Sequence, residues 1–411
     1  MGSTAVEKII SRSAGRAVQV GEFVEVPVDF AYLHDGTGPL IVDALGKMGV
    51  EKVIDPDRVG IVFDHSVPPY SDQAATLQAK VRKFARSQGI LKFHDLGEGI
   101  CHQVMPEKGY VSPGTVVIGA DSHSCTLGCF GLFSSGVGAT DLAYILATGG
   151  TWLKVPETLK VECTGVLKGK LSSKDLILEI VKMVGTDGAT YKALEFSGEA
   201  VRQMSQSSRM TMSNMAVEMG AKTGFMEADA KTFEFLGRTG PVVKTDSKTE
   251  TVTVDAGSLD PKVACPGSVA NVKSVVEVEG THIDQAFLGS CTNGRYEDLY
   301  EAAKIIKGKK VHQDTRFIVI PASKTIQLAA QKDGLMDIFQ EAGAIIGVTG
   351  CGPCLGVHMG VLGENEVCVS TSNRNFIGRM GHPKSSVYLA SAQTVAASAV
   401  EGKITDPRRF A

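Results

Sequence analysis

The sequence lacks any apolar run that approaches the roughly 20 residues of a membrane-spanning helix. It also lacks an apolar signal-peptide core near its start, which reads Met-Gly-Ser-Thr-Ala-Val-Glu-Lys-Ile-Ile-Ser-Arg. A strong excess of charge is missing too, since 42 Lys and Arg face 45 Asp and Glu and the net charge is −3. These absences predict no membrane partner and no nucleic acid partner.

A regular cysteine framework is also missing. The nine cysteines are an odd number without regular spacing, which predicts reduced thiols and a cytoplasmic location. We see no low-complexity tract and no repeat with a period of roughly 20–50 residues, so a solenoid is not expected. With 411 residues, of which 43% are hydrophobic and 21% charged, the chain is large enough for two or three domains.

Short apolar runs separated by helical stretches make up much of the chain. Residues 59–63, 114–119 and 316–321 are apolar without alternation, as expected for parallel strands covered on both faces. Residues 72–88 and 296–307 have the spacing of helices. This order predicts an α/β fold with crossover connections between the strands.

Two changes in pattern predict domain boundaries. Val155-Pro-Glu closes a helix-rich stretch, and a new strand-like run begins at Leu159. Residues 244–257 form a polar strand region in which Thr, Lys and Asp alternate with Val. We therefore expect three α/β domains, at residues 1–156, 157–256 and 257–411.

Three cysteines lie in two glycine-rich turns. Cys291 lies in Gly-Ser-Cys-Thr-Asn, and Cys351 and Cys354 lie in Gly-Cys-Gly-Pro-Cys. Both turns follow apolar runs that we expect to be strands, so the thiols lie where open α/β sheets build their sites. Three thiolates and one open position suit an iron–sulfur cluster in which one iron can act as a Lewis acid.

The same turns permit two other interpretations. Cys-Gly-Pro-Cys also occurs in thioredoxin-like redox motifs, although the aromatic residue expected before the first cysteine is missing here. A structural zinc site is the other alternative, with His358 or Cys368 as the fourth ligand. The spacing of the cysteines alone does not decide among cluster, zinc and redox motif.

Further motifs combine acids, histidines, amides and arginines, most of them directly after strand-like runs. They are Asp64-His65, Asp121-Ser122-His123, Asn214 with Glu218, and Ser372 to Arg379. In this order, and together with the cysteine turns, they resemble the aconitase superfamily over nearly the whole chain. Within it, the sequence is similar to the large subunits of the short, archaeal-type 3-isopropylmalate dehydratases and homoaconitases.

This resemblance implies three α/β/α domains around one [4Fe-4S] cluster. The cluster would be held by Cys291, Cys351 and Cys354, and one iron would have no cysteine ligand. The implied catalytic residues are Asp64, His65, His102, Asp121, His123 and Glu218. Asp64–His65 would pass a proton to the leaving hydroxyl, while His102 would pair with Asp121 and His123 with Glu218.

The resemblance also implies contacts to substrate and cluster. Ser122, Arg374 and Arg379 would bind the substrate, as would His34, which stands where aconitases have a glutamine. Asn214 and Asn373 would donate hydrogen bonds to cluster sulfur or cysteine.

Each of these motifs has a simpler interpretation. An Asp-His dipeptide after a strand is often a helix cap, and two arginines five residues apart can be solvated. Asn214 and Glu218 have the i, i+4 spacing of an ordinary helix-surface pair. Free buried thiols are the expected state of the other cysteines, which are Cys101, Cys125, Cys129, Cys163, Cys265 and Cys368.

The implied function is that of a hydro-lyase subunit that dehydrates and rehydrates a substituted malate, a hydroxy diacid. The expected reaction isomerises 2-isopropylmalate and 3-isopropylmalate in leucine biosynthesis, and homoaconitase or another alkylmalate dehydratase is the alternative. A non-catalytic metal-sensing or RNA-binding relative is an alternative of another class, against which the net charge counts. The last motif lies close to Ala411, so we expect a separate small subunit to carry the swivel domain and the catalytic base.

Overall fold

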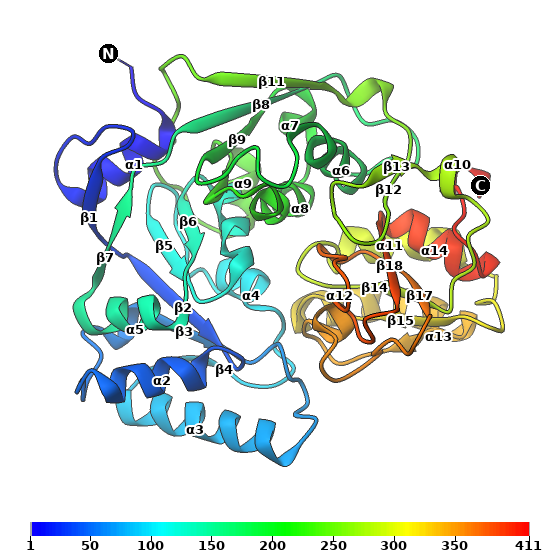
Figure 1. Ribbon diagram of the computed structural model, residues 1–411, viewed down its shortest axis with the longest axis horizontal. Helices are drawn as coiled ribbons and strands as arrows, with labels where there is room; N and C mark the ends of the chain where they lie inside the picture. The colour runs from blue at the N-terminus through cyan, green and yellow to red at the C-terminus, as the bar shows by residue number, and fades with distance from the viewer. Residues whose placement is uncertain (1, 411) are drawn as a thin grey trace.

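The computed structural model describes residues 2–410, so the predicted outer limits at residues 1 and 411 lie outside it. The strands of the three larger sheets come from successive parts of the chain, at residues 30–136, 158–255 and 262–390. In Figure 1 the first group (blue to cyan) lies at the left, the second (green) at the top and the third (yellow to red) at the right. The predicted α/β fold class is confirmed, whereas the domain limits stay a prediction.

The first sheet has five parallel strands in the order β4-β3-β2-β5-β6. Every residue of β2, β3 and β5 is buried, which explains their unalternated apolar sequences. The strands are β2 (Phe30–His34), β3 (Val59–Val62), β4 (Lys92–His94), β5 (Val116–Gly119) and β6 (Phe133–Gly136). The helices of this part are α2 (Gly38–Lys47), α3 (Asp72–Gln88), α4 (Cys101–Glu107) and α5 (Ala139–Thr148).

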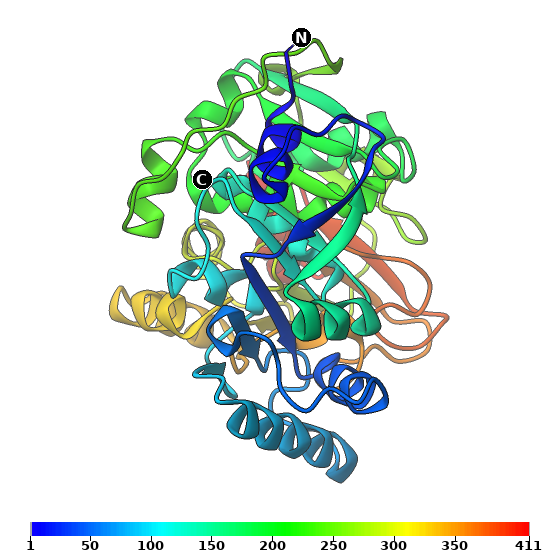
Figure 2. The same cartoon turned by 90° about the vertical axis from the view of Figure 1, so that its left-hand side faces the viewer.

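Helix α3 begins and ends where its sequence predicts. The Ser71 side chain caps its first turn by accepting a hydrogen bond from the Ala74 N–H, and Gly89 ends it with a φ of 72°. Beside this sheet lie α1 (Ala5–Ala14) and an antiparallel ribbon of β1 (Phe23–Pro27) and β7 (Gly150–Lys154), seen from the side in Figure 2.

The second sheet has four parallel strands in the order β10-β9-β8-β11. They are β8 (Thr158–Thr164), β9 (Ala193–Ser197), β10 (Thr223–Phe225) and β11 (Glu250–Asp255). The accompanying helices are α6 (Ser173–Val184), α7 (Glu199–Gln203), α8 (Gln206–Asn214) and α9 (Ala230–Leu236). Helix α8 packs against η2 (Ser122–Phe130), the segment that follows β5, and so joins the second sheet to the first.

The third sheet has seven strands in the order β13-β12-β18-β17-β14-β15-β16, of which β12 pairs antiparallel with both its neighbours. The strands are β12 (Lys262–Ala264), β13 (Val272–Ser274), β14 (Gln285–Leu288), β15 (Arg316–Val319), β16 (Ile345–Ile346), β17 (Val367–Ser370) and β18 (Ser386–Ala390). Its helices are α10 (Val275–Val278), α11 (Tyr296–Ile306), α12 (Lys324–Lys332), α13 (Leu335–Ala342) and α14 (Ala392–Glu401).

Short 3₁₀ segments connect several of these elements. Besides η2 they are η1 (Pro56–Arg58), η3 (Met215–Met219), η4 (Ala256–Ser258), η5 (Gly352–Leu355) and η6 (Pro407–Arg409). Within residues 2–410, no helix has both the length and the apolar sequence needed to cross a membrane. The segments after β3 and β5 and those after β14, β16 and β17 contain most of the predicted site residues, and His34 is the last residue of β2.

Candidate active site

One cavity of about 90 Å³ lies where the carboxyl ends of the first and third sheets face each other. Ligands of open α/β sheets bind at this end of the strands. Most of the predicted site residues line the cavity: His65, His102, Asp121, Ser122, His123, Cys291, Cys351, Cys354, Asn373, Arg374 and Arg379. The other four, His34, Asp64, Asn214 and Glu218, do not line it but contact residues that do.

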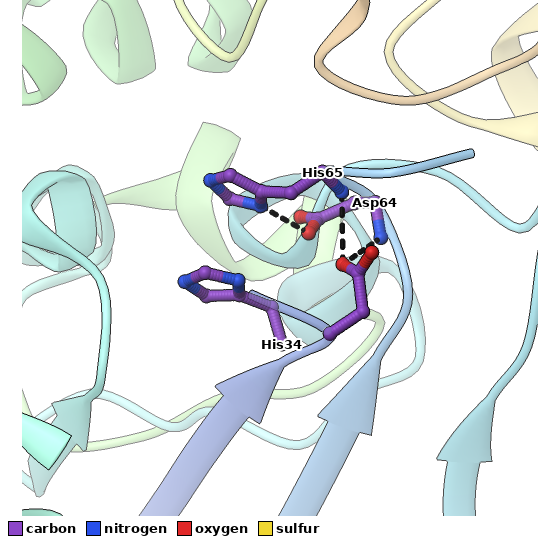
Figure 3. Close-up of side chains that lie close together, drawn as sticks. His34, Asp64 and His65 are labelled. Atoms are coloured by element: carbon purple, nitrogen blue, oxygen red, sulfur yellow. Dashed lines mark hydrogen bonds and ion pairs between the residues drawn. The ribbon is translucent and has the colours of Figure 1, made fainter. Parts of the chain in front are cut away.

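Asp64 and His65 form a buried ion pair directly after β3 (Figure 3). Asp64 Oδ1 lies 2.6 Å from His65 Nδ1, and Asp64 is fully buried. The carboxylate of Asp35 accepts the backbone N–H groups of both residues at 3.0 and 2.9 Å and so fixes the turn. Burial disfavours a charged imidazole, but the neighbouring Cys351 sulfur and Asp64 carboxylate outweigh it and raise the pKa of His65 well above its usual value.

His34 lies beneath His65 rather than at the cavity wall. The two rings are stacked, with centroids 3.8 Å apart and planes 14° from parallel (Figure 3). His34 Nδ1 accepts the Gly36 N–H at 3.1 Å, so its Nε2 carries the hydrogen and points toward Asp121 Oδ2 at 3.6 Å. Burial and the charge of His65 lower the pKa of His34. The predicted substrate contact of His34 stays a prediction.

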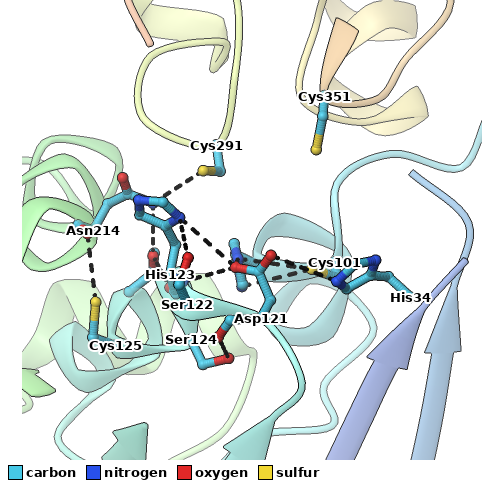
Figure 4. A network of polar contacts seen from close by, with 12 residues as sticks. His34, Cys101, Asp121, Ser122, His123, Ser124, Cys125, Asn214, Cys291 and Cys351 are labelled. Carbon is cyan, nitrogen blue, oxygen red and sulfur yellow. Dashed lines mark hydrogen bonds and ion pairs between the residues drawn. The ribbon is translucent and has the colours of Figure 1, made fainter. Parts of the chain in front are cut away.

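Asp121 is the acceptor on which several of these groups converge (Figure 4). Its Oδ1 lies 2.7 Å from His102 Nε2 and also accepts the backbone N–H of His123 at 2.7 Å. Its Oδ2 lies 3.5 Å from His65 Nε2. Burial would raise the pKa of Asp121, but the imidazole of His102 outweighs burial, and the pKa is held well below its usual range.

His123 belongs to a second chain of polar contacts. Its Nε2 lies 2.8 Å from Glu218 Oε1, which also accepts a hydrogen bond from Arg374 Nε at 2.8 Å. Arg374 Nη1 in turn donates to Ser122 Oγ at 3.1 Å. Burial lowers the pKa of His123, and the charge of Arg374 lowers it further. Burial would raise the pKa of Glu218, but the hydrogen bond from His123 outweighs burial and lowers it. Glu218, from the second part of the chain, thus supports from behind a wall of the cavity that residues of the first and third parts form.

The three predicted cluster cysteines are buried at the opposite wall. Cys291 Sγ lies 3.2 Å from the side-chain nitrogens of both Asn214, at the end of α8, and Asn373, after β17. Burial raises the pKa of Cys291 to about 11 and that of Cys351 well above its usual value. A buried thiol with a raised pKa loses its proton only when a cation binds the sulfur. The three sulfur atoms therefore suit a soft metal group.

The spacing of the sulfur atoms opposes a single zinc ion. Sulfurs on one tetrahedral zinc, at about 2.3 Å from the metal, lie roughly 4 Å apart. Within residues 2–410, the sulfurs of Cys291, Cys351 and Cys354 do not all lie within 4.8 Å of one another. No such group of three forms in the described part of the chain when His358 or Cys368 is included. The segment after Cys351 is the short 3₁₀ turn η5, not the helix that a thioredoxin-like motif requires. The donor set therefore fits a larger group that three thiols hold together.

His34, Asp35, Asp64 and His65 offer a group of possible metal-ligand atoms, but other groups of the protein already bind most of these atoms. Their ligand atoms lie within 4.8 Å of one another. Asp35 uses both carboxylate oxygens on backbone N–H groups, however, and Asp64 is paired with His65. These four residues therefore hold His65 in position.

Two fully buried basic side chains, Arg295 and Lys174, support the loops of the site, and sequence analysis missed both; burial lowers the pKa of Lys174 to about 7. Arg295 donates to the carbonyl oxygens of Cys291 and Thr292, both at 2.6 Å, and to Gln103 Oε1 at 3.0 Å. Lys174 Nζ donates to the carbonyl oxygens of Thr371 and Ser372, at 2.9 and 2.6 Å. Arg295 could have been predicted to lie near the site, because it follows Cys291 by four residues. No site residue lies near Lys174 in the sequence, so its role could not be predicted in this way.

Comparisons with known proteins agree with this geometry. A sequence model of the aconitase family (aconitate hydratase) matches residues 7–275 and 248–402. The 3-isopropylmalate dehydratase large subunit 1 of Methanopyrus kandleri is 52% identical over 100% of both chains. The probable methanogen homoaconitase large subunit of Methanothermobacter thermautotrophicus is 51% identical over 98% of this chain and 97% of that protein.

A solved structure shows the same fold. The crystal structure of Thermococcus kodakaraensis aconitase X in its holo form matches 96% of this chain and 95% of that chain, with a TM-score of 0.56. The two sequences are only 14% identical, so this likeness concerns the fold alone.

Proposed function

Because the chain belongs to the aconitase family, we propose that it is the cluster-bearing large subunit of a hydro-lyase that isomerises 2-isopropylmalate and 3-isopropylmalate. The observation that carries this proposal is the single cavity at which three acid–histidine pairs face three thiols. The large subunit of a homoaconitase is the second candidate, since a relative with that name is 51% identical.

The three cysteines fit a [4Fe-4S] cluster with one iron that lacks a cysteine ligand. Support comes from the three-thiol donor set, from sulfur spacing too wide for one zinc ion, and from the two amide nitrogens at Cys291 Sγ. When bound, such a cluster supplies a Lewis acid that polarises a hydroxyl and a carboxylate oxygen.

The cofactor is tested on protein purified without oxygen. It should contain iron and acid-labile sulfide, and single replacements of Cys291, Cys351 or Cys354 by Ser should abolish the visible absorbance. Cys163→Ser, a matched buried cysteine within β8, should leave the absorbance unchanged. Stoichiometric zinc without sulfide would contradict the cluster.

Arginines at the cavity are suited to bind the substrate carboxylates. Arg379 lines the cavity with Nη2 3.7 Å from Cys354 Sγ, and its Nε has no hydrogen-bond partner among residues 2–410. A carboxylate would satisfy this unpaired buried donor in bidentate geometry. Arg374 and the Ser122 hydroxyl, already joined to each other, provide the neighbouring donors. Together these groups would hold a diacid in one orientation.

His65 is the group best placed to donate a proton to the leaving hydroxyl oxygen. Its raised pKa favours the imidazolium form, and Asp64 holds Nδ1, so that Nε2, 3.5 Å from Asp121 Oδ2, is the nitrogen left to donate a proton. A positioned acid of this kind accelerates such a step by about 10²–10⁴-fold. His123, held by Glu218 and with a lowered pKa, is neutral and serves to orient substrate oxygens.

Dehydration also requires a base that takes a proton from carbon, and we assign this base to a second subunit. The carboxylates of Asp121, which lines the cavity, and of Glu218, which lies behind His123, are weak bases, because imidazole partners lower their pKa values. The names of the relatives include the words large subunit, which supports a small-subunit partner. Phe376 and Ile377, between the two cavity arginines, are 50% and 73% exposed and offer it an apolar docking surface. We propose that this partner carries the swivel domain and the catalytic base.

The function is tested with the enzyme assembled anaerobically from both subunits. The assembled enzyme should interconvert 2- and 3-isopropylmalate with a kcat/KM at least about tenfold higher than for the homoaconitase substrate, a ratio that pocket contacts readily provide. The opposite preference would favour the homoaconitase. Turnover of neither substrate would contradict both candidates.

A further inference from the structure

Tyr32 lies in the middle of β2, is fully buried and does not line the cavity. Its hydroxyl oxygen lies 3.0 Å from His102 Nδ1. The other ring nitrogen of His102, Nε2, lies 2.7 Å from Asp121 Oδ1. The tyrosine and histidine rings meet edge to face, with centroids 5.9 Å apart and planes at 79°. Tyr32, His102 and Asp121 therefore form one buried chain of hydrogen bonds that ends at the cavity wall.

The direction of these hydrogen bonds follows from the chemistry of their ends. An ionised carboxylate only accepts hydrogen bonds, so His102 Nε2 must carry a hydrogen and donate it to Asp121. A neutral imidazole then presents a lone pair at Nδ1. Burial keeps Tyr32 a phenol, because it raises the Tyr32 pKa well above its usual value, and the phenol O–H is the donor to Nδ1.

We infer that Tyr32 is a positioning residue that fixes His102 as the Nε2–H tautomer and aims this N–H at Asp121. If His102 takes up a proton at Nδ1, the Tyr32 oxygen accepts that N–H, so the ring keeps its orientation in both charge states. Asp121 Oδ2 faces His65 Nε2 at 3.5 Å. Tyr32 thus acts on the cavity through His102 and Asp121, and it does not itself line the cavity.

The chain offers a matched control for the loss of one hydroxyl. Tyr110 also forms a tyrosine–histidine contact, with its hydroxyl oxygen 3.1 Å from His94 Nε2, and neither residue lines the cavity. Its ring packs against Phe30 with centroids 5.6 Å apart. Tyr110→Phe therefore removes the same type of hydrogen bond from the same part of the fold without touching the proposed chain.

The direct test is nitrogen-15 NMR of the histidine rings in the full chain, with the His102 signals identified by their loss in His102→Asn. In the wild type, His102 Nε2 should be protonated and Nδ1 should show the shift of an unprotonated, hydrogen-bonded nitrogen. Tyr32→Phe should move the Nδ1 signal, and Tyr110→Phe should move only His94. Protonation of Nδ1 rather than Nε2 in the neutral wild-type ring would overturn the inference, as would unchanged His102 signals in Tyr32→Phe.

A second test measures activity, and only this test of the inference rests on the proposed function. In the assembled enzyme, Tyr32→Phe should lower kcat about tenfold or more with little change in KM, whereas Tyr110→Phe should keep kcat within about twofold. Equal losses in both variants would show a packing effect and overturn the positioning role. If no preparation dehydrates a malate, the proposed function fails and the NMR result still decides the role of Tyr32.

Discussion

Two histidines at the cavity differ in the direction of their pKa shifts because they differ in partners. His65 lies between Asp64 and Asp121 and has a raised pKa, whereas His123 shares Glu218 with Arg374 and has a lowered one. One charged and one neutral imidazole can therefore coexist at the same cavity. We therefore propose proton donation for the first and orientation of substrate oxygens for the second.

The charge of His65 leads to a prediction about pH. The imidazolium form exists below the pKa of His65, so turnover of the assembled enzyme should fall as pH rises through this raised pKa. Asp64→Asn removes the carboxylate that stabilises the imidazolium, so the fall should move to lower pH, and turnover at neutral pH should drop by about 10² or more. The measurement is kcat/KM against pH, with the visible absorbance as a check on the cluster. His94→Asn, at the end of the neighbouring β4, is the control and should leave the profile in place. An unchanged profile in Asp64→Asn would exclude His65 as the donor.

Strands and helices of the fold could be predicted well because their signals are local. The helix predicted over residues 72–88 is α3 with the same limits, and the run at residues 114–119 contains β5. The predicted strand before Cys351 is also present as β16, but it has only two residues, because it lies at the sheet edge and pairs with one neighbour.

Contacts between elements could be predicted only where a motif pointed to them. The His102–Asp121 and His123–Glu218 contacts occur as the resemblance implied, whereas the catalytic roles stay predictions. Arg295 reaches Gln103 across 192 residues of sequence, and no local pattern encodes such a contact. The stacking of His34 on His65 was equally invisible, because it depends on how β2 and β3 lie side by side.

Arg295 provides a prediction at the scale of elements, because it joins the loop after β14 to α4. Arg295→Met should lower the free energy of unfolding by about 3 kcal/mol, since it leaves the buried carbonyl oxygen of Cys291 without a donor and that of Thr292 with only the Thr211 hydroxyl. Arg409→Met removes the exposed ion pair with Glu279 and should cost about 1 kcal/mol or less. Urea unfolding followed by circular dichroism measures both. Equal effects of the two variants would show that Arg295 does not tie these elements together.

At the scale of the whole molecule, the first and third parts of the chain line one cavity, and the second part supports its walls. The first sheet supplies the histidine–carboxylate pairs, the third supplies the thiols and arginines, and the segment after α8 supplies Glu218. Such a cavity depends on how the parts are held together, which composition and periodicity do not reveal. The family resemblance supplied this information in place of local signals.

The docking surface formed by Phe376 and Ile377 predicts where the partner binds. Changing both residues to Ser should weaken association with the small subunit by about tenfold or more, because apolar area at the interface is lost. Leu91, which is 85% exposed between α3 and β4, is the control, and Leu91→Ser should leave the affinity unchanged. Binding is measured by calorimetry with the cluster in place. Equal affinity of the double variant and the wild type would place the interface elsewhere.

The division of labour between two subunits is the central claim, and the rate of hydration of the unsaturated diacid tests it most directly. The rate is followed by the loss of ultraviolet absorbance, with the anaerobically prepared chain alone and after addition of the small subunit. The account predicts that the chain alone reaches less than about a hundredth of the rate of the pair, because it has the acid and the cluster site but lacks the base. A full rate from the chain alone would contradict the account.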